Sequence, residues 1–455
     1  MSMEEKNIVA IEIGSSKVKG ALGQVSDKGV ITVQAVEEEP FLEWVRYGEV
    51  SNVEEVAATL RRIIERLEMR IAPAVIAEVY VAVGARSLCS TTRSVEHHLV
   101  EEMEIGDDIL RELQNQVRMA APADRVLLAV LPREYAVDRK PVTQPKGTLG
   151  NSVSMDAVLL TCRKQIKSKL ERLLTDKLGL KVAGFIVRQT AIADAVLTHE
   201  EKRIGCMLVD FGAETTTVSI YKNGSLQFLQ TLPMGSRNIT RDLMSLNYLE
   251  ERAEEIKRRQ GNAFGTTIGA MEEAINYDQV NKCVSARAAE IIANIKEQLK
   301  QSGFTASQLA RGIVVVGRGA FLSGFNDRLA KDTGMNVRSG SVSTAEVRIS
   351  DVRISPVDSV DVLSIIRAAA KGHTHECLAM PQPEVQPEPE IMDAPVVVEE
   401  VVEKVVEPEP APAPAPAQTA RAPRRSPWDR LRGIMDKLEG GLVEDDDDDL
   451  RDDRD

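Results

Sequence analysis

Two segments far apart in the sequence share an arrangement of residues that could bind phosphate groups. Each has an apolar strand, an acidic residue near its end, a glycine, small hydroxyl residues and a second strand. They read IVAIEIGSSKVKG at 8–20 and MLVDFGAETTTVSIY at 207–221. Glycine lets a turn bring backbone N–H groups close to a phosphate, and hydroxyl groups add donors. Two such turns facing each other would hold a polyphosphate from both sides.

The chemistry of these turns assigns a role to each residue type. Glu12 and Asp210, at the strand ends, are candidates to hold Mg²⁺ directly or through water. The candidate phosphate-binding residues are Gly14, Ser15, Ser16 and Lys17 in the first turn and Gly212, Ala213, Glu214, Thr215 and Thr216 in the second. Each segment taken alone also fits a plain β-hairpin or a Thr-rich edge strand.

A third glycine-bearing segment, GIVVVGRGAFLSG at 312–324, follows the same logic. A short apolar strand is followed by Gly317, Arg318, Gly319 and Ala320 and then by a helix-like stretch, a pattern that many α/β crossovers share. The chain has neither a Walker A motif nor a complete GxGxxG motif. The common alternative nucleotide-binding folds are therefore not supported.

The elements that must position these turns alternate between strand and helix. Apolar runs predict buried strands at Val9–Ile13, Val79–Val83, Leu208–Phe211 and Ile313–Val316. Apolar residues at helical spacing predict helices within 56–67, 109–117, 170–178 and 288–299. Because strands and helices interleave, an α/β fold is expected. The two similar hairpins indicate two halves of similar build with a cleft between them.

Composition limits the cellular setting and the partners. The chain has 455 residues, too many for a single core, and its five cysteines are scattered without a CxxC pair. Scattered cysteines indicate a reducing cytoplasm. The net charge of −13 lies mostly in residues 378–455, which carry −12, while the remainder carries −1. The nearly neutral body predicts no binding to nucleic acid.

The C-terminal region divides into three segments. Pro and Glu dominate 378–423 and predict a disordered linker, 424–442 regain helical periodicity, and 443–455 form an acidic tail. The apolar stripe of the predicted helix consists of Trp428, Leu431, Ile434, Met435, Leu438 and Leu442. Residues 421–440 carry six bases and three acids, so the helix is expected to lie on an anionic membrane surface. The alternative is that it docks on the body or on a partner.

In their order and spacing, the three turns resemble those of the actin, Hsp70 and sugar-kinase superfamily. The resemblance implies that the first two are phosphate loops, that the third contacts adenosine, and that the ligands are ATP and Mg²⁺. Glu254 and Lys257 match the acid and the base of the superfamily's adenosine-side helix, although such a pair is also a common surface ion pair. Gln189 lies roughly where actin relatives position the attacking water.

Longer stretches are similar to the bacterial cell-division family FtsA across nearly all of residues 7–377. They are 179–226 and LPMGSRNITRDL around the second loop, VLLAVLPREYAVD and GNSVSMDAVLLT in the family's inserted subdomain 1C, and SARAAEIIANIKEQLKQSG in its subdomain 2B. The resemblance implies an actin-like two-domain fold with an interdomain nucleotide cleft and a 1C insert. It also implies an adaptor that anchors the ring of the tubulin homologue FtsZ to the cytoplasmic face of the inner membrane at the division site.

The implied partners are the C-terminal peptide of FtsZ, further copies of the chain in filaments, and an anionic membrane. Arg287, Lys296 and Lys300 on the 2B helix could attract the acidic FtsZ peptide. The expected subdomains are 1A (1–84 and 165–201), 1C (85–164), 2A (202–245 and 311–377) and 2B (246–310), followed by the linker, helix and acidic tail.

Two positions depart from the family pattern. Glu214 stands where the second loop is usually glycine-rich, and Arg318 stands where the third loop usually has a glycine pair. A carboxylate near phosphates repels them unless a metal intervenes. Two alternatives to an ATP-binding adaptor therefore stay open: a nucleotide-independent scaffold, and a small-molecule kinase or ATPase of the same fold. The adaptor is expected to have at most weak ATPase activity.

Overall fold

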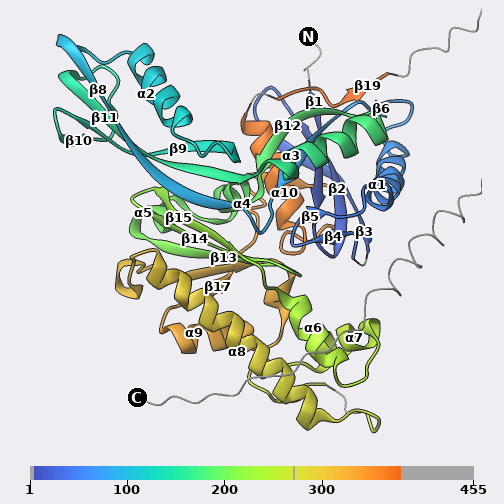
Figure 1. Ribbon diagram of the computed structural model, residues 1–455. Helices are drawn as coiled ribbons and strands as arrows, with labels where there is room; N and C mark the ends of the chain where they lie inside the picture. Colours follow the sequence, from blue (N-terminus) through green and yellow to red (C-terminus); the bar gives the residue numbers. More distant parts are fainter. Residues whose placement is uncertain (1–4, 42, 270–271, 373, 381–455) are drawn as a thin grey trace, which may run out of the picture. The chain divides into compact units, whose positions relative to one another are not determined.

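The computed structural model describes residues 5–41, 43–269, 272–372 and 374–380. All of the described residues belong to one compact unit (Figure 1). The predicted membrane helix and acidic tail lie outside the described residues, as does the predicted linker beyond residue 380.

Six strands form the first sheet, in the order β12-β7-β1-β2-β3-β18. Their bounds are β12 Lys181–Val187, β7 Glu78–Val83, β1 Lys6–Ile13, β2 Lys17–Val25, β3 Ile31–Pro40 and β18 Val347–Ile349. The neighbours β1, β7 and β12 run parallel, so they end at the same edge of the sheet. The chain leaves this edge at Gly14, Gly84 and Arg188, which places residues from three distant segments together.

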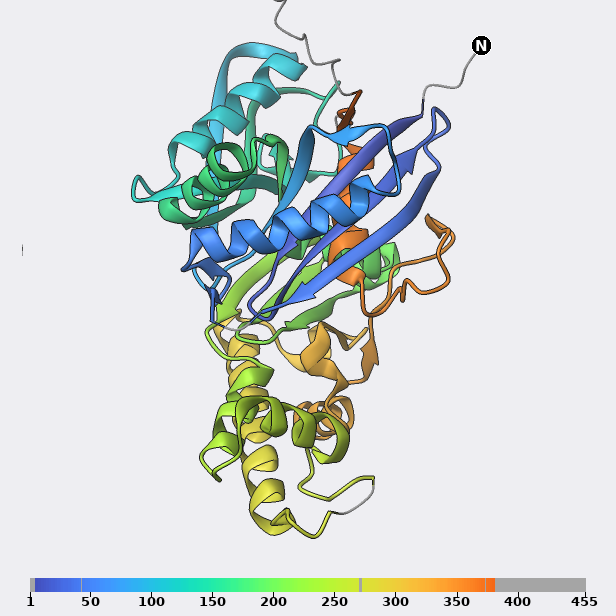
Figure 2. The ribbon, with the colours of Figure 1, turned by 90° about the vertical axis from the view of Figure 1, so that its right-hand side faces the viewer.

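Two glycines on β2 let helices approach both faces of this sheet. A Cβ atom at Gly20 would lie 2.6 Å from Cγ2 of Ile63 in α1 (Val53–Glu68), and one at Gly23 would lie 2.8 Å from Cγ2 of Ile366 in α10 (Val360–Lys371). Residues three apart on a strand face opposite sides. The result is three layers, with α1 (blue) across one face and α10 (orange) behind the sheet in Figure 2.

Nine strands form the second sheet, in the order β10-β9-β11-β8-β15-β14-β13-β16-β17. Their bounds are β10 Lys140–Val142, β9 Arg125–Val137, β11 Leu149–Arg163, β8 Cys89–Glu104, β15 Ser225–Leu232, β14 Thr216–Lys222, β13 Cys206–Phe211, β16 Ile313–Val316 and β17 Val337–Ser339. The insert supplies β8 to β11 and the helix α2 (Asp107–Met119) that packs against them. It joins the rest of the sheet where Cys89 pairs with Gln230.

The remaining helices pack around these sheets. Met207, Val209 and Phe211 of β13 point into a core with the long helix α8, and Cys206 and Leu208 of the same strand point into the core of the first sheet. The other bounds are α3 Lys164–Glu171, which continues into a π-helical turn Arg172–Asp176, α4 Arg188–Val196, α5 His199–Ile204, α6 Ser236–Met244, α7 Glu250–Gln260, α8 Tyr277–Gln301 and α9 Phe325–Thr333. A short hairpin pairs β4 (Val45–Arg46) with β5 (Glu49–Val50), and a separate two-stranded sheet pairs β6 (Val75–Ile76) with β19 (Leu378–Ala379).

The strands and helices predicted within the described residues are all present, but one predicted domain assignment is wrong. Residues 347–379 belong with the first sheet: β18 pairs with β3, α10 packs into the core of that sheet, and β19 pairs with β6. The segment 311–377 therefore does not lie wholly in the second core, and residues 378–379, which were predicted to begin the linker, form β19. The other predicted boundaries stay predictions.

Candidate functional site

The two similar hairpins have the same turn geometry. In the first, between β1 and β2, the backbone N–H of Gly14 donates to the carbonyl of Lys17 with an N···O distance of 3.0 Å. In the second, between β13 and β14, Gly212 donates to Thr215 at 2.9 Å. The similarity in sequence is therefore a similarity in backbone, and both glycine amides are engaged within their own turns.

Arg188 lies between the two acids that were predicted to hold Mg²⁺. Its Nη1 is 2.9 Å from Oε1 of Glu12, and its Nη2 is 2.7 Å from Oδ2 of Asp210. Glu12 is 4% exposed and Asp210 is 5% exposed. The structure thus brings the two predicted acids together, but one guanidinium group bridges them.

Sequence reasoning missed Arg188. It is the only charged residue from 182 to 193, and it begins a helix. The helix dipole disfavours a cation at that end. A base in an apolar stretch and at an unfavourable helix end is the signal that could have revealed a buried acidic partner.

A second ion pair extends this buried cluster. Lys19 of β2 is 1% exposed, and its Nζ lies 2.8 Å from the carboxylate of Asp361 in α10 and 2.6 Å from the carbonyl of Asp358. Burial alone would raise the pKa of Asp361, but the attraction of Lys19 and its hydrogen bond outweigh burial and lower it. The cluster contains three acids and two bases, so one negative charge is left uncompensated.

That excess charge falls on Glu12. Burial, followed by repulsion from Asp361, raises the pKa of Glu12 to about 7 despite the opposing attraction of Arg188 and Lys19. Burial also raises the pKa of Asp210. Between the ordinary carboxyl pKa of Glu12 and about 7, the folded protein therefore holds a proton that the unfolded chain releases.

The contribution of Glu12 to stability should consequently fall as the pH rises through this window. The unfolding free energy of the wild type should decrease between pH 5 and pH 8. We expect this decrease to be smaller in Glu12→Gln by about 1–3 kcal/mol. Urea unfolding of both proteins at several pH values measures the difference. Parallel curves for wild type and variant would contradict a protonated Glu12.

Glu214, the first departure from the family pattern, is completely buried in the second turn. One carboxylate oxygen accepts a hydrogen bond from the backbone N–H of Tyr47 at 2.7 Å. The other accepts from Nη2 of Arg241 and lies 3.6 Å from Nη1 of Arg237 and 3.7 Å from Nε of Arg46. The carboxylate is therefore surrounded by donors and three cations rather than left beside an open site.

Several predicted phosphate-binding side chains also have partners within the chain. Lys17 pairs with Glu38 at 2.5 Å. The hydroxyl of Ser15 accepts from the backbone N–H of Gly48 at 3.0 Å, and the hydroxyl of Thr216 donates to the carbonyl of Met234 at 2.8 Å. Ser16 and Ala213 also accept hydrogen bonds through their carbonyl groups, from the amides of Phe41 and Arg237. Thr215 is 9% exposed.

The third turn packs against the second core. Gly317 has a φ of +87°, and an added Cβ would lie 2.5 Å from the carbonyl oxygen of Phe211. A Cβ at Gly319 would lie 2.7 Å from the Phe211 ring. Both positions require glycine because the chain approaches β13 closely. Arg318 is partly exposed and lies 3.8 Å from Asp358, and Ala320 packs against the same core.

The predicted adenosine-side pair is an ion pair in this structure. Nζ of Lys257 lies 2.6 Å from Glu254 and 2.9 Å from the hydroxyl of Thr240, and Lys257 is 6% exposed. Gln189 is buried, and its Nε2 is 3.4 Å from the Thr217 hydroxyl. Its buried Oε1 has no hydrogen-bond partner among the described residues. The catalytic role suggested for Gln189 stays a prediction.

The geometry does not fit Mg²⁺ at the predicted place. Mg²⁺ needs near-octahedral oxygen ligands, whereas both carboxylates here contact the guanidinium of Arg188. Glu214 adds a negative charge in the turn that was expected to receive phosphate. The described residues thus bring the predicted site together, but its acids contact basic side chains of the protein itself.

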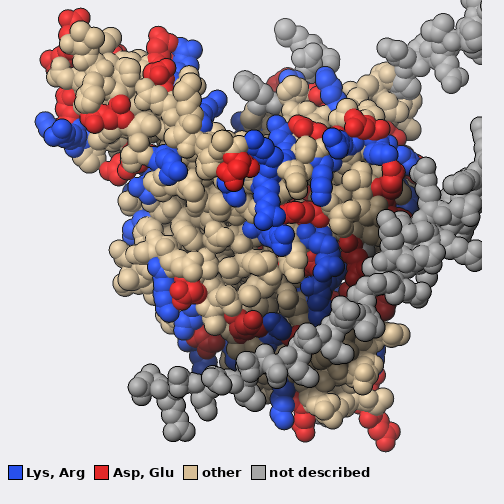
Figure 3. All heavy atoms as spheres, viewed as in Figure 1, with Lys and Arg blue, Asp and Glu red and all other residues tan. Residues whose placement is uncertain are grey.

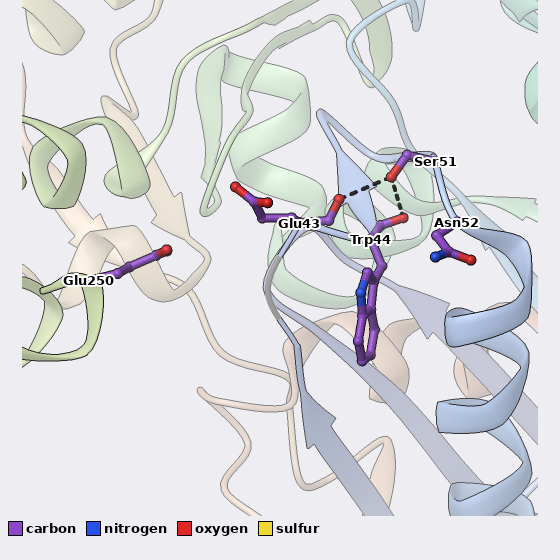
Figure 4. A pocket seen from close by; sticks show the side chains of 5 residues that line it. All are labelled: Glu43, Trp44, Ser51, Asn52 and Glu250. Carbon is purple, nitrogen blue, oxygen red and sulfur yellow. Dashed lines mark hydrogen bonds between the residues drawn. The ribbon is translucent and has the colours of Figure 1, made fainter. Parts of the chain in front are cut away.

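Two openings flank the loop that carries Tyr47. A cavity of about 690 Å³ is lined by Glu43, Trp44, Ser51 and Asn52 on one side and by Glu250 of α7 on the other (Figure 4). Its two carboxylates come from opposite halves of the protein. A smaller cavity of about 300 Å³ includes Arg46, Arg86 and Lys169 in its lining. In Figure 3 many basic side chains, with some acidic ones among them, lie over α3 and the β4–β5 hairpin.

The predicted FtsZ-binding bases on α8 differ in their availability. Arg287 contacts Asp242 at 2.6 Å and also pairs with Glu290. Lys300 pairs with Glu297 at 3.1 Å, and Lys296 is exposed. Lys296 and Lys300 are therefore the more accessible candidates.

None of the helices in the described part of the chain has the length and hydrophobicity that a membrane span requires.

Comparison with known proteins supports the family resemblance. The model described as "Cell division protein FtsA" matches residues 207–356, and that described as "SHS2 domain inserted in FTSA" matches 86–161. Cell division protein FtsA of Porphyromonas gingivalis is 30% identical over 379 residues, covering 80% of this chain and 77% of that protein. The Bacillus subtilis protein of the same name is 27% identical over 357 residues, covering 75% and 80%.

A solved structure with a similar fold is the PilM-PilN type IV pilus biogenesis complex. It matches with a TM-score of 0.58 and 17% identity over 80% of this chain and 98% of that chain. This likeness concerns the fold alone and agrees with an actin-like α/β architecture. Given the sequence identity over most of its length, the chain belongs to the FtsA family of cell division proteins.

Proposed function

We propose that this cell-division protein is an adaptor that holds FtsZ at the cytoplasmic face of the cell membrane, and that its cleft is closed by internal ion pairs rather than by ATP and Mg²⁺. The bridge from Arg188 to Glu12 and Asp210 carries the second part of the proposal. It supplies a fixed positive charge between two acids that would otherwise need a metal. Of the alternatives left open by the sequence, the geometry favours the nucleotide-independent scaffold.

The adaptor role combines two parts of the chain. The exposed bases of α8, Lys296 and Lys300, would attract the acidic FtsZ peptide, and the apolar stripe from Trp428 to Leu442 would bind the bilayer. Self-association into filaments would let many weak membrane contacts act together. No observation favours a small-molecule kinase, because the acids and hydroxyl groups that would serve phosphate transfer contact the protein itself.

Membrane attachment can be tested by flotation of FtsZ with anionic liposomes. We expect Leu431→Glu combined with Leu438→Glu to abolish recruitment of FtsZ, because the charges destroy the apolar stripe. A chain truncated after Leu442 loses seven net negative charges and should recruit more FtsZ than the wild type. Unchanged recruitment by the double variant would contradict the membrane role of the stripe.

A further inference from the structure

We infer that Glu214 is an internal ligand, and that its carboxylate fills a site for a phosphate-type anion formed by Arg46, Arg237, Arg241 and the backbone N–H of Tyr47. The inference concerns the cleft alone and does not depend on the adaptor role. In the wild type the site is closed to external anions. Without the Glu214 carboxylate, it would accept inorganic phosphate or the terminal phosphoryl group of a nucleotide.

The donors around Glu214 are arranged as they would be around an anion. The Tyr47 amide and Arg241 Nη2 bond different oxygens of the carboxylate, and two further guanidinium groups lie within 3.7 Å. Hydrogen bonds from several charged donors are the strongest that a phosphate or carboxylate receives. Glu214 is 0% exposed and Arg237 is 8% exposed, whereas the side chains of Arg46 and Arg241, which are 45% and 35% exposed, form the solvent side of the site.

The donors come from both halves of the protein. Arg46 and Tyr47 lie in the β4–β5 hairpin of the first half, and Arg237 and Arg241 lie on α6 of the second. Arg237 also donates through Nη1 to the carbonyl of Ser15 in the first turn, at 3.0 Å. A ligand at this place therefore joins the two halves, which is what a bound polyphosphate would do between the two turns.

The Tyr47 amide is held in position by its surroundings. Tyr47 has a φ of +52°, an uncommon conformation for a residue with a side chain. Its carbonyl accepts a hydrogen bond from the amide of Arg86, whose guanidinium lies 5.3 Å from the Tyr47 ring centroid. At Gly48 a Cβ would lie 2.4 Å from the carbonyl of Gly84, so the hairpin fits closely against the sheet edge. The donor geometry should therefore survive removal of the Glu214 side chain.

The charge balance shows why an anion would enter. Arg46, Arg237 and Arg241 face Glu214 and one further acid, Glu250, which lies 3.5 Å from Arg237. With Glu214 removed, three guanidinium groups face a single carboxylate. The buried guanidinium of Arg237 is costly to leave without a partner, and a small dianion would pair with it and with the part-exposed Arg46 and Arg241 while accepting their hydrogen bonds. An ordinary structural ion pair would lose stability on mutation without gaining affinity for phosphate.

Equilibrium dialysis of the full chain against radiolabelled inorganic phosphate, at constant ionic strength, tests the inference. We expect Glu214→Ala to bind one phosphate at least about tenfold more tightly than the wild type, a difference of about 1.4 kcal/mol. Adding Arg241→Ala should remove this gain. The control Glu200→Ala breaks the exposed pair with Arg311 and should behave as the wild type. Equal binding by wild type and Glu214→Ala, or a gain that persists without Arg241, would overturn the inference.

Two further measurements complete the test. If Glu214→Ala does not fold in chloride, phosphate at equal ionic strength should restore its cooperative unfolding transition, and failure to restore it would count against the site. ADP without Mg²⁺ then distinguishes the source of the anion. Tighter binding of ADP than of phosphate by Glu214→Ala means that the site belongs to a nucleotide, whereas equal or weaker binding of ADP means a site for free phosphate. Both results support the anion site.

Discussion

Arg188→Met is expected to lower the free energy of unfolding by about 3–5 kcal/mol, because it leaves the buried carboxylates of Glu12 and Asp210 without their shared partner. Both acids are at most 5% exposed, so water cannot replace the lost guanidinium. Urea unfolding measures the change. Arg188→Lys cannot bridge both acids with a planar fork, so it should also lower the free energy of unfolding. Because it keeps the positive charge, the decrease should be smaller than for Arg188→Met.

The exposed pair of Arg311 with Glu200 provides the matched control. Arg311→Met should change the free energy of unfolding by less than about 1 kcal/mol, because exposed ion pairs contribute little. If Arg188→Met is as mild as Arg311→Met, the bridge does not hold the cleft together.

The same variant offers a test for metal binding. In Arg188→Met the two carboxylates become free oxygen ligands, so Mg²⁺ is expected to recover part of the lost stability. The wild type should not respond, since Arg188 already occupies the place between the acids. Equal stabilisation of both proteins by Mg²⁺ would show that the metal binds elsewhere or coexists with Arg188.

Lys19→Met is expected to have the second large effect, again about 3–5 kcal/mol of unfolding free energy. Lys19 holds α10 against β2 through Asp361 and the Asp358 carbonyl, and its loss leaves Asp361 buried beside Glu12 and Asp210. Combining Lys19→Met with Asp361→Leu removes both charges and should recover part of the loss. A double variant less stable than the sum of the single changes would contradict this account.

The sequence predicted what depends on local pattern. The strands β1, β7, β13 and β16 follow from short apolar runs, and α1 follows from an apolar stripe that packs on the sheet. The match between the two hairpins also predicted a common turn geometry, which the backbone hydrogen bonds of Gly14 and Gly212 show. These features are set by residues that are neighbours along the chain.

What depends on segments meeting in space was not predicted. The helix α10 was missed because it is apolar around much of its surface and shows no clear stripe, and its packing places 347–379 with the first sheet. Arg188 follows β12, whereas its partners Glu12 and Asp210 lie in β1 and β13. The partners of Glu214 lie in the β4–β5 hairpin and in α6. Glu214 was therefore predicted to repel phosphate, but its three arginines could not be foreseen.

We propose that the cleft of this FtsA-family protein is closed by its own charges and that the protein works without Mg·ATP. Flotation of FtsZ with anionic liposomes and nucleotide-stripped wild-type protein tests it most directly, with EDTA in one sample and ATP with Mg²⁺ in the other. We predict equal recruitment of FtsZ in both samples. Recruitment that requires ATP and Mg²⁺ would contradict the claim.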